Sequence, residues 1–203
     1  LVGTGPLGSA IARRLPHPPA LLHHKRPEPA AALATTVPGS QHAPSLDALL
    51  DALAPSSLLL FNLRTSSDVL ATLGKLPATS RRLAGHHVVN ISSGSPDDGR
   101  AVRDALRGSG VASYVDGAYC GGPDKVASGA GALFLSCDAG PEAFQEWRST
   151  LSALGRIVDA GPVGASRALD YGVVDLAFVS FLSYASNAAM LEAEGVPLDL
   201  FLQ

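Results

Sequence analysis

The chain opens with three glycines, Gly3, Gly5 and Gly8, spaced as G-x-G-x-x-G between two apolar residues and a helical pattern. The first glycine permits a tight turn, the second lets the backbone approach a pyrophosphate, and the third lets a helix pack against the preceding strand. The N-terminus of that helix presents free N–H groups to phosphate. We therefore predict a dinucleotide-binding turn rather than a plain turn, made of Gly3, Thr4, Gly5, Pro6, Leu7 and Gly8.

Basic residues follow the second predicted strand, where they bear on the choice of cofactor. NAD-binding domains usually place Asp or Glu about 20 residues after the first glycine, to hold the ribose 2′-hydroxyl. Here positions 23–26 read His-His-Lys-Arg, and the first acid is Glu28. Lys and Arg bind phosphate through charge-assisted hydrogen bonds. NADPH is therefore the predicted cofactor, with His24, Lys25 and Arg26 at its 2′-phosphate; the alternative is a solvated loop.

Two further strands are predicted to end in polar residues. Leu63 and Arg64 follow an apolar run at 57–62, and Asn90 lies near the end of another at 87–91. Cofactor sites gather at the carboxyl edge of parallel sheets. We expect Leu63 and Arg64 to contact the cofactor, and Asn90 to contact the nicotinamide ribose or the substrate.

The elements that must position these residues alternate along the first two thirds of the chain. Apolar runs predict strands, and amphipathic patterns between them predict helices, an order typical of an α/β fold with a parallel sheet covered on both faces. Only Leu1 and Val2 precede Gly3, so we expect the first strand to begin upstream. Further strands are predicted at 20–23, 57–62, 87–91, 112–115, 132–136 and 156–158, and helices at 9–15, 46–53, 67–73, 96–107 and 141–154.

A long apolar helical pattern without proline runs from 164 to 194. Such a helix would be roughly 45 Å long, and a helix that is apolar on nearly all sides is normally buried. We expect residues beyond 203 or a second subunit to cover it. A membrane span is the alternative, which Asp170 and Asp175 disfavour.

Composition narrows the class of protein. The net charge of −3 and the absence of a polybasic run argue against a nucleic-acid partner. Two cysteines do not make a disulfide framework, which favours a reducing, cytoplasmic location. No histidine pair joins Cys, Asp or Glu at a metal-ligand spacing, so we expect no metal site.

Four segments in order carry a resemblance to a known family. Residues 3–8, 88–96, 114–118 with Pro123, and 164–170 are similar to G-L-G-x-M-G, V-N-L-T-S-G-T-P, Y-L-D-G-A…P and G-x-A-x-x-x-D, with Ser166 in place of Ala in the last. Over essentially its whole length, the chain resembles the imine reductases and reductive aminases. These lie in the 6-phosphogluconate-dehydrogenase-like superfamily, with the β-hydroxyacid dehydrogenases as relatives.

The resemblance implies a domain organisation. Residues 1–162 would form an NADP-binding Rossmann domain, and residues 163–203 an interdomain helix and the start of a C-terminal helical dimerisation domain. Most of that helical bundle would be absent from this chain. The resemblance also implies a domain-swapped homodimer, with each active site between one Rossmann domain and the partner's bundle.

The resemblance further implies reduction of C=N bonds by hydride transfer from the nicotinamide C4 of NADPH. Asp170 stands at the acid position, as proton donor or iminium stabiliser, and desolvation would favour its protonated form. An acid that merely interacts with the helix dipole is the alternative. Tyr119, Cys120 and Phe178 are implied to line the pocket of a small imine or carbonyl substrate. Phe178 stands where many reductive aminases carry Tyr, which weakens the case for amine activation.

Two alternatives remain open at this point. A β-hydroxyacid dehydrogenase keeps some support, because residues 116–123 retain part of the D-A-P-V-S-G-G-P substrate loop. That family uses a lysine near the start of the long helix, whereas the three lysines here are Lys25, Lys75 and Lys125. A non-catalytic NADP-binding protein is the second alternative.

Overall fold

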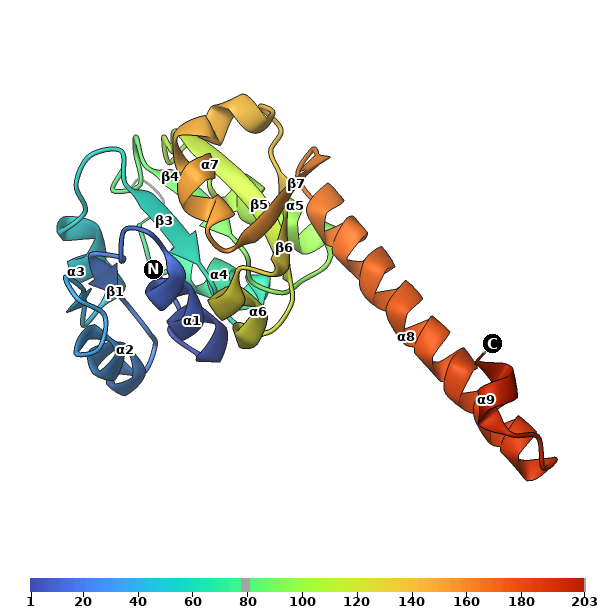
Figure 1. Ribbon diagram of the computed structural model, residues 1–203. Helices are drawn as coiled ribbons and strands as arrows, with labels where there is room; N and C mark the ends of the chain where they lie inside the picture. Colours follow the sequence, from blue (N-terminus) through green and yellow to red (C-terminus); the bar gives the residue numbers. More distant parts are fainter. Residues whose placement is uncertain (78–80, 203) are drawn as a thin grey trace.

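A computed structural model describes residues 1–77 and 81–202. It has an α/β domain from which one long helix projects (Figure 1). The predicted fold class, a Rossmann domain followed by a long helix, is confirmed. The main sheet has five strands in the order β3-β4-β5-β6-β7. Their bounds are Leu58–Phe61, His87–Asn90, Ser113–Cys120, Gly131–Ser136 and Gly155–Gly161.

The first three residues join this sheet to a smaller one. Strands β1 (Leu21–Leu22) and β2 (Gln41–His42) pair in parallel, and Val2 bridges His23 on one side and Phe61 on the other. The Val2 N–H donates to the Leu60 carbonyl at 2.9 Å, and the Gly3 N–H donates to the His23 carbonyl at 2.8 Å. The start of the chain thus lies between β1 and β3, the central position of a doubly wound sheet.

Helices cover both faces of the sheet. Ser45, Thr65 and Ser95 cap three of them, as their side chains accept hydrogen bonds from the backbone of the first turn. Residues of one strand alternate between two apolar clusters: Leu60 belongs to the first, and Leu59 and Phe61 to the second. The helices of this domain are α1 (Pro6–Arg14), α2 (Pro27–Ala34), α3 (Leu46–Asp51), α4 (Ser66–Leu73), α5 (Pro96–Ala105), α6 (Pro123–Ser128), the 3₁₀ helix η1 (Pro141–Phe144) and α7 (Gln145–Ser152).

The sheet departs from the predicted all-parallel arrangement at one pair. Strand β6 runs antiparallel to β5, with Gly117 opposite Leu135. Only ten residues, 121–130, connect the two strands, and a parallel crossover requires about a dozen or more. The chain therefore turns back through the short helix α6, which was not predicted. Strand β5 also runs to Cys120, beyond the predicted end at 115, because its second half pairs with β6.

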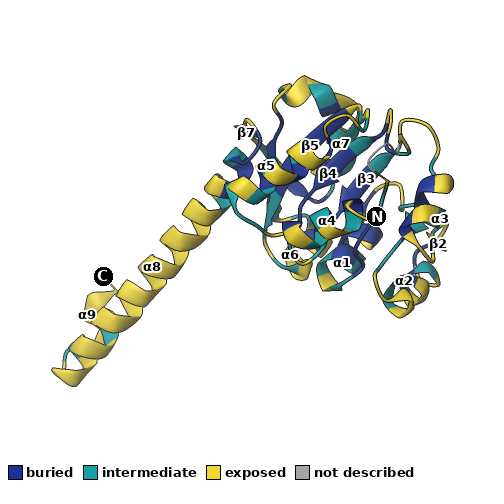
Figure 2. Ribbon diagram, turned by 180° about the vertical axis from the view of Figure 1, so that it is seen from behind, coloured by how far each residue is buried: buried dark blue, intermediate teal, exposed yellow. Residues whose placement is uncertain are grey.

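The predicted long helix is confirmed as α8 (Ala165–Ala193), followed by the short helix α9 (Leu198–Phe201). By length and composition alone α8 is apolar enough to cross a membrane. Its buried residues, Ser166 and Arg167, lie in its first turn, and beyond them the helix is almost entirely exposed (Figure 2). Large apolar side chains such as Leu176, Phe178 and Phe181 are each more than 60% exposed.

Candidate functional site

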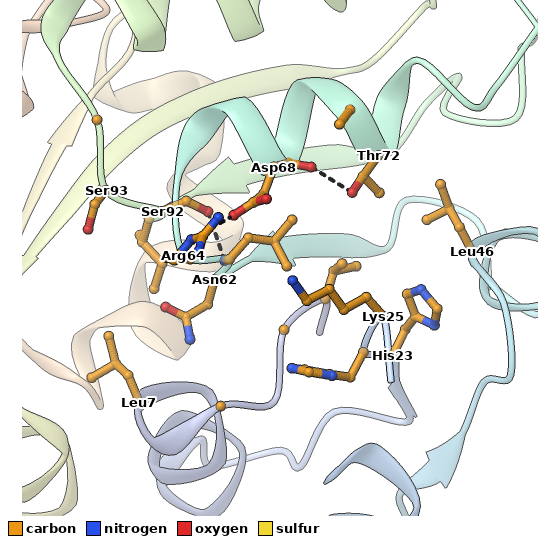
Figure 3. Close-up of a pocket in the computed structure, with 18 of the residues that line it drawn as sticks. Leu7, His23, Lys25, Leu46, Asn62, Arg64, Asp68, Thr72, Ser92 and Ser93 are labelled. Atoms are coloured by element: carbon orange, nitrogen blue, oxygen red, sulfur yellow. Dashed lines mark hydrogen bonds and ion pairs between the residues drawn. The ribbon is translucent and has the colours of Figure 1, made fainter. Parts of the chain in front are cut away.

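A cleft of about 860 Å³ lies at the carboxyl ends of the central strands. Its walls come from the glycine turn, the ends of β1 and β3, the loop after β4, the middle of β5 and the first turns of α8. Figure 3 shows His23 and Lys25 toward one end of this cleft and Ser92 and Ser93 toward the other. Of the predicted site residues, the cleft is lined by Gly3, Gly5, Pro6, Leu7, His24, Lys25, Leu63, Arg64, Tyr119 and Asp170.

The glycines of the first turn differ in what surrounds them. Gly3 has a φ of +101°, and a Cβ there would lie 2.1 Å from the Asn62 carbonyl oxygen. A Cβ on Gly8 would lie 2.0 Å from the Gly3 carbonyl oxygen, so both positions exclude a side chain. Around Gly5 no atom lies within 4 Å of such a Cβ. Gly5 is thus the position at which another molecule can approach the backbone.

Helix α1 begins directly after this open position. Gly5 is its N-cap, without a side-chain hydrogen bond, and the N–H groups of its first turn have no partner within the helix. Within the described residues, the buried Thr4 hydroxyl also has no hydrogen-bond partner. An open backbone cradle at a helix N-terminus fits a pyrophosphate. The residues present therefore fit a dinucleotide.

Basic side chains gather at the end of the cleft formed by β1. His23, His24 and Lys25 line it, and so does Lys75, which follows α4 and which the sequence analysis missed. Burial lowers the pKa of His23, against the effect of a hydrogen bond to the Ala43 carbonyl oxygen, and the nearby His42, His24 and Lys75 lower it further. Arg26 is the N-cap of α2 and does not line the cleft.

The acids at this end are engaged by other residues. Asp47 pairs with Arg82, and the carboxylate of Asp68 lies 3.5 Å from Arg64 Nε. The basic residues of the turn after β1 therefore share their end of the cleft with carboxylates that are already paired. This arrangement favours a ligand that carries an additional negative charge.

The strand ends β3 and β4 form the middle of the cleft. Leu63 lines it, and its N–H donates to Ser92 Oγ at 2.8 Å. Asn90 is fully buried beneath this wall: its side-chain Oδ1 accepts from the Ser92 N–H at 3.0 Å, and its Nδ2 donates to Ser66 Oγ at 3.3 Å. The predicted contact of Asn90 with ribose or substrate stays a prediction, whereas Ser92 and Ser93, which it supports, line the cleft.

Helix α8 packs against β5, β6 and β7, whereas the basic residues follow β1 on the other side of the sheet, so Asp170 and Tyr171 line the end of the cleft opposite those residues. Asp170 is half-buried, and this burial raises the pKa of its carboxyl group, against the opposing effect of the Arg167 charge. A carboxyl group that holds its proton more strongly is suited to donate it near neutral pH. The partial burial of Asp170 is thus part of its chemistry.

The other predicted substrate residues take different positions. The Tyr119 ring lines the cleft, while its hydroxyl donates to the Leu154 carbonyl at 2.9 Å. Cys120 does not line the cleft; burial and then the charge of Asp170 raise the pKa of its thiol. Phe178 is 65% exposed on the outer part of α8 and lies outside the cleft. Roles for Cys120 and Phe178 stay predictions.

Within residues 1–77 and 81–202, no three His, Cys, Asp or Glu residues lie close enough together to hold a metal ion.

Comparison with known proteins gives a consistent result for the fold. No family model matches the chain, and no curated protein matches it. Among solved structures, a variant of an imine reductase from Myxococcus stipitatus in complex with NAD⁺ matches with a TM-score of 0.83, at 26% identity over 98% of this chain. A reductive aminase from Aspergillus terreus in complex with NADPH and ethyl-5-oxohexanoate matches with a TM-score of 0.79, at 25% identity over 99% of this chain.

An imine reductase from Bacillus cereus matches the fold with a TM-score of 0.83, at 23% identity over 99% of this chain. The chain spans 66% of the length of the Myxococcus stipitatus protein and 68% of each of the other two. These matches include α8, because they leave no more than 2% of the chain uncovered. The chain therefore has the fold of the imine reductases and reductive aminases, as its motifs indicated.

Proposed function

We propose that this protein is an NADPH-dependent oxidoreductase that reduces C=N bonds. The observation that carries the proposal is the presence of Asp170 in the same cleft as the open glycine turn, at the end opposite the basic residues. The similarity to an imine reductase crystallised with NAD⁺ and to a reductive aminase crystallised with NADPH supports this function.

Different residues of the cleft bind different parts of NADPH in this proposal. The α1 N-terminus at Gly5 receives the pyrophosphate, since its N–H groups are free and no side chain obstructs them. Lys25 and His24 face the 2′-phosphate, with Lys75 as a further cation on the same side. Leu63, Arg64 and Ser92 line the middle of the cleft, along the path toward α8. When bound, NADPH supplies the hydride for the carbon of the C=N bond.

Asp170 donates the proton in this proposal. Asp170 lines the cleft from α8, and burial favours the protonated form that a general acid needs. General acid catalysis of this kind contributes about 10²- to 10⁴-fold to a rate. The Tyr119 ring and Tyr171 line the cleft beside it and define a site for a small imine or ketone-derived substrate.

The lysines of the chain do not supply the acid that a β-hydroxyacid dehydrogenase uses. Lys25 and Lys75 line the basic end of the cleft, and Lys125 lies on α6. The region 164–194 contains no lysine. Reduction of a C=N bond with Asp170 as the acid accounts for the residues at the α8 end of the cleft, whereas alcohol–ketone chemistry with a lysine as the acid does not.

The test is NADPH oxidation by the protein with a small cyclic imine and, separately, with a β-keto acid. Each reaction is repeated with Asp170→Asn, which keeps the size of the side chain and removes its acidic proton. We expect turnover of the imine and its loss in the variant. Turnover of the keto acid alone would favour a dehydrogenase, and binding of NADPH without turnover of either would favour a non-catalytic protein.

We further propose that the protein is a soluble, cytoplasmic homodimer built on α8. Apolar side chains are exposed along most of this helix, including Val173, Leu176 and Phe181, and water-exposed surfaces of this kind mark interfaces. The matched enzymes include a counterpart of this helix, which supports a subunit interface over a membrane span. In the domain-swapped form, the helical bundle that follows α8 in one subunit completes the site of the other. Light scattering tests this: a dimeric mass is expected, and a monomer would contradict it.

A further inference from the structure

A buried ion pair lies at the root of α8, one helical turn before Asp170. The Arg167 side chain is only 2% exposed and that of Asp116, on β5, is fully buried. Arg167 Nε donates to both carboxylate oxygens of Asp116, at 2.8 and 2.9 Å, and one of its terminal nitrogens donates to Oδ1 at 2.7 Å. The other terminal nitrogen donates to the Ser92 carbonyl oxygen at 2.8 Å. One guanidinium thus joins α8, β5 and the loop after β4.

The groups around this pair are satisfied by further hydrogen bonds. The Gly164 N–H and the Tyr114 hydroxyl donate to the Asp116 carboxylate, each at 3.2 Å. Ser166 Oγ donates to the Asp116 carbonyl at 3.1 Å, and the Ser166 N–H donates to Ser136 Oγ at 2.6 Å. Beyond these first residues α8 is exposed. The orientation of the whole helix therefore depends on this small buried network.

Arg167 and Asp170 stand three residues apart on the same helix, and such residues are neighbours on one helix face. Both line the same end of the cleft. Asp170 is close enough to sense the guanidinium charge, which opposes the effect of burial on the pKa of its carboxyl group. Other titratable groups also bear on the site. Asp98 on α5 and Tyr114 of β5 interact with Arg167, and Cys120 of β5 interacts with Asp170. Tyr119 of β5 and Tyr171 of α8 line the cleft.

We propose that Arg167 is a positioning residue for Asp170: clamped between Asp116 and Ser92, it fixes the first turns of α8 at the cleft and holds a permanent positive charge beside the Asp170 carboxyl group. That this positioning serves catalysis rests on the proposed function, whereas the effect of the Arg167 charge on the Asp170 carboxyl group does not. No sequence pattern pointed to Arg167. Its partner Asp116 lies 51 residues earlier in the chain.

The test separates the charge of Arg167 from its geometry. Arg167→Lys keeps the positive charge but cannot reproduce the planar fork of hydrogen bonds, and Arg167→Gln removes the charge. The titration midpoint of the Asp170 carboxyl group is followed by ¹³C NMR in the protein and both variants, with the Asp170 signal assigned by its loss in Asp170→Asn. We expect Arg167→Gln to raise the titration midpoint of Asp170 by about one pH unit and Arg167→Lys to leave it near that of the parent protein.

A midpoint that is the same in all three proteins would overturn the proposal. Because loss of one partner of a buried pair can prevent folding, the double variant Arg167→Gln with Asp116→Asn replaces the single one if circular dichroism shows unfolding. It removes both buried charges, and its Asp170 midpoint is still expected above the parent value. An unchanged midpoint there overturns the proposal equally. The readout needs no substrate, so failure of imine turnover would count against the proposed function and not against the role of Arg167.

Discussion

Alanine substitutions at two glycines of the first turn should affect different properties: the stability of the protein at Gly8 and the affinity for NADPH at Gly5. At Gly8 the new methyl group would lie 2.0 Å from the Gly3 carbonyl oxygen and 2.9 Å from the Asn62 side-chain nitrogen. Overpacking of this kind costs about 1–3 kcal/mol, and alanine returns up to about 1 kcal/mol through its helix propensity. Because the contact is with rigid backbone, we expect a net loss of about 2 kcal/mol in the free energy of unfolding.

At Gly5 the methyl group meets no atom within 4 Å, and the φ of −68° suits any residue. Loss of a glycine N-cap should cost less than about 1 kcal/mol. The methyl group instead occupies the space where a pyrophosphate must approach α1. We therefore expect the dissociation constant for NADPH to rise at least about tenfold, equivalent to about 1.4 kcal/mol.

Urea denaturation gives the stability of each variant, and NADPH fluorescence titration gives the affinity. The expected pattern is a destabilised Gly8→Ala protein and a stable Gly5→Ala protein that binds NADPH poorly. Parent-like affinity in Gly5→Ala would refute the assignment of this turn to the pyrophosphate. Parent-like stability in Gly8→Ala would refute the packing argument.

Three further changes test other parts of the structure. Asp116→Asn leaves the Arg167 charge buried without its partner, and urea denaturation should show a loss of about 3–5 kcal/mol; a loss below about 1 kcal/mol, typical of exposed pairs, would contradict the buried network. Hydrogen bonds from Ser95 lower the pKa of Asp98 below 3.8, so the stability that they contribute is present above that pH and is lost as the pH falls through the folded-state pKa. Asp98→Asn should therefore flatten the dependence of the free energy of unfolding on pH below about pH 4. An unchanged dependence in this pH range would exclude this contribution of Asp98. Lys25→Ala should weaken binding of NADPH about tenfold and leave NADH unaffected; equal weakening of both cofactors would remove Lys25 from the 2′-phosphate.

Much of the fold could be predicted because local signals and tertiary structure agree. Continuous apolar runs gave the positions of β3 and β4 to within a residue or two, and the long pattern without proline gave α8. The antiparallel turn at β6 was missed because it depends on the length of the β5–β6 connection rather than on the residues of either strand. The predicted single helix at 141–154 is divided into η1 and α7 at Phe144, whose side chain is buried in the core.

The candidate site was predictable where its residues lie in one segment and not where they meet from several. The glycine turn and the basic residues after β1 are local; Gly5, His24 and Lys25 line the cleft, whereas Arg26 does not. Lys75 reaches the cleft from the segment after α4, and Arg167 is held by Asp116 from a distant strand, so neither could be found from spacing in the sequence. We expect Asn90 to contact a ligand from its place at a strand end; the structure shows its side chain hydrogen-bonded to Ser92 and Ser66, and the ligand contact stays a prediction.

The role of Asp170 as proton donor is tested most directly with a matched pair of substrates: a cyclic imine, which needs a proton, and its N-methyl iminium ion, which already carries the positive charge. NADPH oxidation is measured with each substrate in the parent protein and in Asp170→Asn. For the imine we expect the rate to fall about 100-fold or more in the variant, whereas the rate for the iminium ion stays close to that of the parent. An equal fall for both substrates, or no fall for either, would contradict proton donation by Asp170.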